Sequence, residues 1–132
     1  PVSQPVSPDS ASRDLEIGLI LAERLEPAAI VHVPLAIRNI QTGGTDLVFR
    51  YVNDGHPNQT CAFLTSNLFY AALTGRSPEG FDYDTVVETK AKDGKDPDGG
   101  ELKVVFDEKT KVYLQNAAFE AAQEFKRLSD AR

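Results

Sequence analysis

The sequence is poor in the residues on which several classes of protein depend. Its 132 residues include one cysteine, Cys61, so no intrachain disulfide can form. The two histidines and the cysteine do not show the spacing of a metal site, and we expect neither a metal nor a cofactor. A glycine-rich phosphate-binding loop is also missing.

Long apolar runs and an excess of positive charge are missing as well. No run reaches the roughly 18 apolar residues that a membrane span needs. Acidic residues outnumber basic ones by 20 to 14, which gives a formal net charge of -6. A general nucleic-acid binder needs a basic face, and so does a protein that adsorbs to anionic membranes. We therefore expect neither nucleic acid nor a membrane as a partner. The compartment is left open, with an extracytoplasmic or secreted location favoured.

The remaining composition is that of an ordinary globular protein, with 41% hydrophobic and 26% charged residues. Residues 1–12 contain three prolines and four serines, which predicts a disordered leader or linker. Residues 13–132 are long enough for one domain with one core. We expect them to form a single α/β segment.

Apolar spacing predicts three helices. The first covers 13–26, between Ser12 as N-cap and Pro27 as a stop. The second runs from about residue 58 to residue 74 and ends at glycine. The third starts near Asp107, which is a good N-cap. In the second helix the residues at helical spacing are Ala62, Phe63, Ser66, Phe69, Tyr70 and Leu73.

Three short segments are rich in β-branched residues. "AAIVHVPLA", residues 28–36, predicts a buried parallel strand, and a short helical turn follows over 35–40. "YDTVVETK" and "ELKVVF" flank the turn-rich "AKDGKDPDGG" and predict a peripheral β-hairpin. Helices and strands in this order indicate a layered α/β fold.

His56 stands on a loop directly before the second predicted helix. Asp54 precedes it by two residues and Asn53 by three. An oxygen from either side chain at the imidazole Nδ1–H would fix the tautomer and leave Nε2 as a general base. The same residues also fit a turn that holds a histidine without a catalytic role. His32 and Cys61, in contrast, are predicted to be buried structural residues.

The segment "NDGHPNQTCAFLTSNLFYAALTGRSPEG", residues 53–80, resembles the last block of the SGNH (GDSL-like) hydrolases. In that family an aspartate and a histidine precede "HPN", and a helix with "FYA.LTG.SP" follows. A looser similarity extends over residues 14–128. The residues that fit the block are His56, Pro57, Asn58, Phe63, Leu64, Phe69, Tyr70, Leu73, Thr74, Gly75, Ser77 and Pro78.

The resemblance implies a three-layer α/β/α flavodoxin-like fold, of which this chain would be a C-terminal part with a peripheral hairpin. It also implies hydrolysis of acyl or acetyl esters, often on carbohydrates, by a serine, a histidine base and an orienting aspartate. His56 matches the base, and Asn53 occupies the aspartate position, with Asp54 displaced by one. The "GDS" nucleophile block and the oxyanion blocks are not found in the sequence.

Two functions follow from this pattern. The first is the histidine-bearing portion of an SGNH-type esterase whose nucleophile lies outside this chain. The alternative is a non-catalytic module that binds a carbohydrate or a protein. A partial fold would expose apolar surface, so we expect a second chain, an N-terminal fragment or self-association to cover it. We also expect an oxygen of Asp54 or Asn53 within about 3.5 Å of a ring nitrogen of His56, and Asn53 is favoured.

Overall fold

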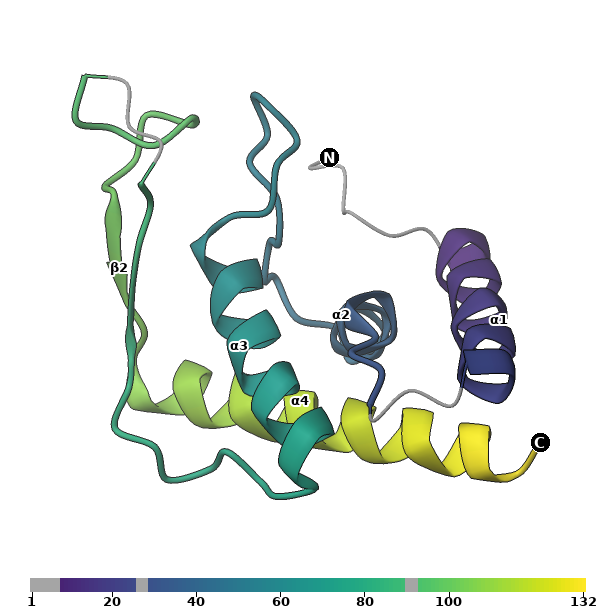
Figure 1. Ribbon diagram of the computed structural model, residues 1–132. Helices are drawn as coiled ribbons and strands as arrows, with labels where there is room; N and C mark the ends of the chain where they lie inside the picture. Colours follow the sequence, from purple (N-terminus) through teal and green to yellow (C-terminus); the bar gives the residue numbers. More distant parts are fainter. Residues whose placement is uncertain (1–7, 26–28, 90–92) are drawn as a thin grey trace.

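Four helices and one two-stranded hairpin make up the part of the chain that the structure describes (Figure 1). The structure is a computed structural model, and it describes residues 8–25, 29–89 and 93–132. The elements in chain order are α1 (Pro8–Leu25), α2 (Val33–Thr42), α3 (Gln59–Thr74), β1 (Thr85–Val87), β2 (Lys103–Val105) and α4 (Glu108–Asp130).

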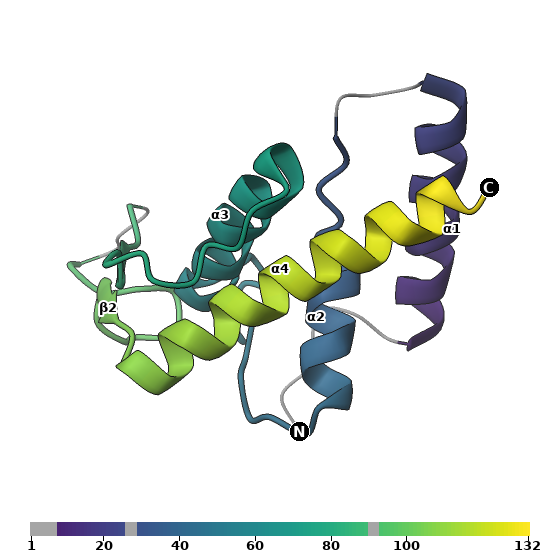
Figure 2. The ribbon, with the colours of Figure 1, turned by 90° about the horizontal axis from the view of Figure 1, so that it is seen from below.

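Helix α4 is the element on which the others are assembled. It contacts α1, α2 and α3, and these three helices lie on the same side of it (Figures 1 and 2). The hairpin lies at the α3 end of this arrangement, and α1 lies at the other end. The result is a layer of three helices on one long helix.

The core consists of a large and a small cluster. The large one joins α2, α3 and α4 with Phe49 and Phe106. At its centre Phe63 is completely buried, and its ring lies 5.0 Å from that of Tyr83 and 4.6 Å from that of Phe106. The small cluster attaches α1 to the rest through Leu19, Leu35 and Phe125.

The predicted helix from residue 58 to residue 74 and the predicted last helix are confirmed. Asn58 Oδ1 accepts the Cys61 N–H at 3.1 Å, and Gly75 ends α3 with φ at +68°, where glycine is favoured. Asp107 caps α4 by accepting the Thr110 N–H at 2.8 Å. The predicted hairpin is also confirmed, because β1 and β2 pair in antiparallel fashion.

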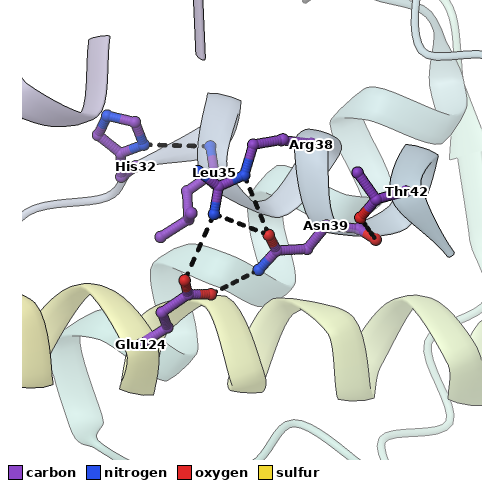
Figure 3. Close-up of polar contacts among 6 residues, drawn as sticks. All are labelled: His32, Leu35, Arg38, Asn39, Thr42 and Glu124. Atoms are coloured by element: carbon purple, nitrogen blue, oxygen red, sulfur yellow. Dashed lines mark hydrogen bonds and ion pairs between the residues drawn. The ribbon is translucent and has the colours of Figure 1, made fainter. Parts of the chain in front are cut away.

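The three-layer α/β/α flavodoxin-like fold is wrong. In the described residues the antiparallel hairpin is the only sheet, and the predicted parallel strand over 28–36 does not form. Residues 29–32 have no regular structure, and α2 begins at Val33. His32 causes this start, because its Nδ1 accepts the Leu35 N–H at 3.1 Å as an N-cap (Figure 3). Pro34 then fits the first turn, where no N–H is needed.

Helix α1 starts earlier than expected. It begins at Pro8, so residues 8–12 are helical rather than part of a disordered leader. Residues 1–7 lie outside the described residues, and so does Pro27, the expected stop. Helix α1 is described up to Leu25.

The buried face of α3 does not coincide with the residues that the sequence places at helical spacing. Phe63 is buried as expected, but Ala62, Ser66, Phe69 and Leu73 are exposed. The helix buries Cys61, Leu64, Leu68 and Ala71 instead. No helix in the described residues is long and apolar enough to cross a membrane.

Candidate functional site

His56 lies in a tight loop between Phe49 and helix α3. The Tyr51 N–H donates to the His56 carbonyl at 2.9 Å, and the Gly55 N–H donates to the Tyr51 carbonyl at 3.0 Å. Gly55 has φ at +72°, a conformation that favours glycine. Arg50 Nη1 also donates to the Gly55 carbonyl at 2.8 Å. These bonds make the loop a short closed turn.

The carboxylate of Asp98, in the segment before β2, binds the backbone of this loop at residues 52 and 53. Asp98 accepts the backbone N–H groups of Val52 and Asn53, each at 2.8 Å. The Asn53 side chain donates to the Pro97 carbonyl at 3.2 Å. Asn53 is therefore bound to the neighbouring loop rather than to the imidazole.

Asp54 holds His56 through two contacts. Its Oδ1 accepts the His56 backbone N–H at 2.9 Å, and its Oδ2 lies 3.2 Å from Nδ1 of the ring. A carboxylate at this position favours the tautomer with the proton on Nδ1, which leaves the Nε2 lone pair available. The imidazole side chain is 71% exposed, so Nε2 is accessible from outside the chain.

The geometric prediction for His56 is confirmed, because a carboxylate oxygen lies within 3.5 Å of a ring nitrogen. The preference for Asn53 over Asp54 is wrong. Asn53 is fixed by contacts with residues 97 and 98, which are more than 40 positions away in the sequence. Asp54 does not cap α3, because Asn58 is the N-cap of that helix.

Among the residues that the structure describes, no nucleophile is bound to this histidine. Within residues 8–25, 29–89 and 93–132, no hydroxyl or thiol group is hydrogen-bonded to the His56 ring. Cys61 is buried as predicted, and this burial raises the pKa of its thiol, which suppresses the reactive thiolate. The pair Asp54–His56 can therefore transfer a proton, but it cannot by itself form a covalent acyl intermediate.

Tyr51 connects the loop to the hairpin through a buried network that the sequence did not indicate. Its side chain is 3% exposed, and the hydroxyl lies 2.8 Å from Gln59 Oε1 and 2.9 Å from Glu88 Oε2. Gln59 Nε2 also donates to the Leu102 carbonyl at 3.2 Å. Burial, and then the hydrogen bond with Glu88, raise the pKa of Tyr51. The available sequence signal was Gln59, a polar residue directly after the N-cap of α3.

The surroundings of His56 form an open surface. Two hollows, of about 310 and 160 Å³, lie elsewhere: one between the ends of α1, α3 and α4, and the other between α2 and α4. The described residues also contain no group of three or more histidine, cysteine, aspartate or glutamate side chains that could hold a metal ion. A substrate at His56 would need a wall that another segment supplies.

Comparisons of this chain with protein-family models, with curated proteins and with solved structures found no match.

Proposed function

We propose that this chain is the histidine-bearing portion of an SGNH-type serine ester hydrolase, with the nucleophilic serine on a segment outside this chain. The observation that carries the proposal is the contact of Asp54 with Nδ1 of His56, the first residue of the "HPN" segment that precedes α3. The resemblance of residues 53–80 to the histidine block of that family supports it. The exposed ring supports a site that a second segment completes.

The chemistry assigned to this chain is proton transfer at Nε2 of His56. The ring takes the proton from the serine Oγ as that oxygen attacks the ester carbonyl carbon. The imidazolium that results is stabilised by the negative charge of Asp54 next to Nδ1. Nε2 then returns the proton to the leaving alkoxide, and the acyl-enzyme is hydrolysed by a water that the same nitrogen activates.

Asp54 has an advantage over Asn53 in this role. A carboxylate can stabilise the imidazolium by its charge, whereas an amide oxygen can only accept the hydrogen bond. The family places its acid three residues before the histidine, and this chain has Asn53 there. Because Asp54 reaches the ring from two residues before it, the substitution at 53 does not by itself remove the orienting acid.

A binding module without catalytic activity is the alternative. The observation in its favour is the lack of a nucleophile next to His56 among the described residues. Such a module would bind a carbohydrate or a protein over the same open surface. The gene sequence upstream of Pro1 separates the two functions, because a "GDS" block there supplies the missing serine.

The enzymatic proposal is tested with the complete gene product and an aryl acetate substrate. We expect hydrolysis, and we expect His56→Ala to lower kcat by about 10³-fold or more. Asp54→Asn should lower kcat strongly as well, with KM little changed, because the ring loses the charge that stabilises the imidazolium. Asn53→Ala is the matched control in the same loop and should cause a much smaller loss.

An inactive gene product, or full activity of the His56→Ala variant, would overturn this proposal in favour of the binding module. Circular dichroism of each variant excludes unfolding as the cause of a lost activity. A fluorophosphonate probe that labels the gene product covalently would identify the serine directly.

A further inference from the structure

The outer face of α1 carries two large aliphatic side chains that are exposed to solvent. Ile17 is 51% exposed and Leu21 is 44% exposed. The opposite face of the helix is used for packing, with Ala11 and Leu19 buried. Helix α1 lies at one edge of the molecule, so its outer face is accessible (Figures 1 and 2).

Two opposite charges flank this aliphatic pair. Asp14 precedes Ile17 by three residues, and Arg24 follows Leu21 by three. The spacing of 3, 4 and 3 places all four side chains on one face of the helix, in the order of a and d positions of a heptad. Among the described residues neither Asp14 nor Arg24 takes part in an ion pair, whereas Glu16 is bound by Arg132 at 2.6 Å.

We propose that the face formed by Asp14, Ile17, Leu21 and Arg24 is a self-association surface, and that its partner is the same face of a second copy in antiparallel orientation. In an antiparallel helix pair the a positions of one helix meet the d positions of the other. Ile17 then packs against Leu21 of the second copy, and Asp14 meets Arg24 of the second copy. The two-fold symmetry repeats both contacts.

The same charges argue against a parallel pair. Parallel packing would place Asp14 beside Asp14 and Arg24 beside Arg24 of the second copy, and like charges at such positions are destabilising. Of the two orientations, only the antiparallel one gives both the aliphatic contacts and the pairs of opposite charge. The proposal does not depend on the esterase function.

The contact covers about three helical turns, which is small for a protein interface, and two chains that each carry a net charge of -6 repel one another. We therefore infer a weak dimer with a Kd on the order of 100 µM. Sedimentation equilibrium of this chain from low micromolar to millimolar concentration in moderate salt measures it.

Charge reversal tests the register. Arg24→Glu should raise the dimer Kd by about tenfold or more, because it turns two attractions into two repulsions. Asp14→Arg should do the same. The double variant Asp14→Arg with Arg24→Glu should restore the Kd to near that of the wild type, because the two charges are exchanged and attract again. If either residue only stabilised its own helix, the double variant would not recover the wild-type Kd. Lys109→Glu is the matched control, since it changes the net charge as Arg24→Glu does but lies on α4.

Three results would overturn the proposal. The first is a wild-type chain that stays monomeric up to millimolar concentration. The second is a double variant that dimerises no better than the single ones. The third is a Lys109→Glu control that weakens association as much as Arg24→Glu, which would show a general effect of net charge. Ile17→Ser with Leu21→Ser should abolish the dimer while the helix content stays unchanged, because both side chains are exposed.

Discussion

At the scale of single residues, the two histidines have opposite environments. His32 is 8% exposed, caps α2, and stacks on Phe125 with the ring centroids 5.3 Å apart. Gly18 gives this ring its space, since a Cβ there would lie 2.9 Å from His32 Cδ2. His56 contacts Asp54 in an exposed turn. One histidine is therefore buried and supports the fold, and the other has an exposed ring.

His32→Ala should lower the free energy of unfolding by about 2–3 kcal/mol, because the variant loses the N-cap and leaves a cavity beside Phe125. Urea unfolding followed by circular dichroism measures this difference. His56→Ala is the control, and it should change the free energy of unfolding by less than about 0.5 kcal/mol. Equal losses for the two variants would contradict this division of roles.

The residues that could be predicted at this scale act through their sequence neighbours. Asn58 and Asp107 accept hydrogen bonds from N–H groups three residues later, and Gly75 needs only its own backbone conformation. The choice between Asn53 and Asp54 depended on Pro97 and Asp98, which no local pattern connects to this loop. The sequence indicated the candidates, but the long-range contact decided between them.

At the scale of elements, a polar network joins α2 to α4. Glu124 accepts hydrogen bonds from Asn39 Nδ2 at 2.6 Å and from Arg38 Nη2 at 3.4 Å (Figure 3). Arg38 also donates to Asn39 Oδ1 at 3.1 Å, so the three side chains support one another. All of them are partly shielded from water, where such contacts are stronger than on an open surface.

Glu124→Ala should therefore lower the free energy of unfolding by about 1–2 kcal/mol, since Asn39 and Arg38 both lose their acceptor. Glu120→Ala is the matched control, one turn earlier on the same helix and exposed, with an expected change of less than about 0.5 kcal/mol. A double-mutant cycle with Asn39→Ala measures the coupling. If the double variant loses the sum of the two single losses in unfolding free energy, Asn39 and Glu124 are not coupled and the network does not join the helices.

The contact of Tyr51 with Glu88, the residue after β1, predicts a dependence on alkaline pH. Its pKa in the folded chain is raised by burial and by Glu88, whereas an unfolded tyrosine titrates near pH 10. Above about pH 10 the unfolded chain therefore binds fewer protons than the folded one, and stability falls as the pH rises. The urea midpoint should decrease between pH 9 and pH 11, and the decrease should be smaller in Tyr51→Phe. An identical decrease in both proteins would assign it to other groups.

Helix α3 shows why the buried face of an element can be mispredicted when its type is correct. Apolar residues occur all around this helix, so their spacing does not select one side. The structure buries Leu64 and Leu68 and exposes Phe69 and Leu73. The contacts with α4 and β1 determine the orientation, and these contacts are made by residues distant in the sequence.

At the scale of the whole molecule, the predicted fold class was wrong because a strand needs a neighbouring strand. Ile30, Val31 and Val33 have the composition of a buried strand, and that composition favoured a parallel sheet. Within the described ranges no other segment pairs with them, and His32 and Pro34 direct the chain into α2. The segment is apolar as predicted, but Ile30, Val31 and Val33 are only partly buried, and the sequence does not show which segment would pair with them.

The division of the core into two clusters predicts unequal stability across the molecule. None of the described residues of α1 belongs to the large cluster, which α2, α3 and α4 form with Phe49 and Phe106. Helix α1 is attached through the small cluster around Leu19. Because fewer buried contacts hold it, α1 should open at a lower free energy than the rest of the chain.

Native-state hydrogen exchange tests this order of stability. At low micromolar concentration, amides in α1 should exchange at least about tenfold faster than those in the middle of α3 and α4. At near-millimolar concentration the pairing of two α1 helices should slow the exchange of α1 in the wild type, because a bound state protects what it covers. Arg24→Glu is the control that should lack this slowing. Protection of α1 equal to that of α4 in the dilute sample would show that the two clusters open as one unit.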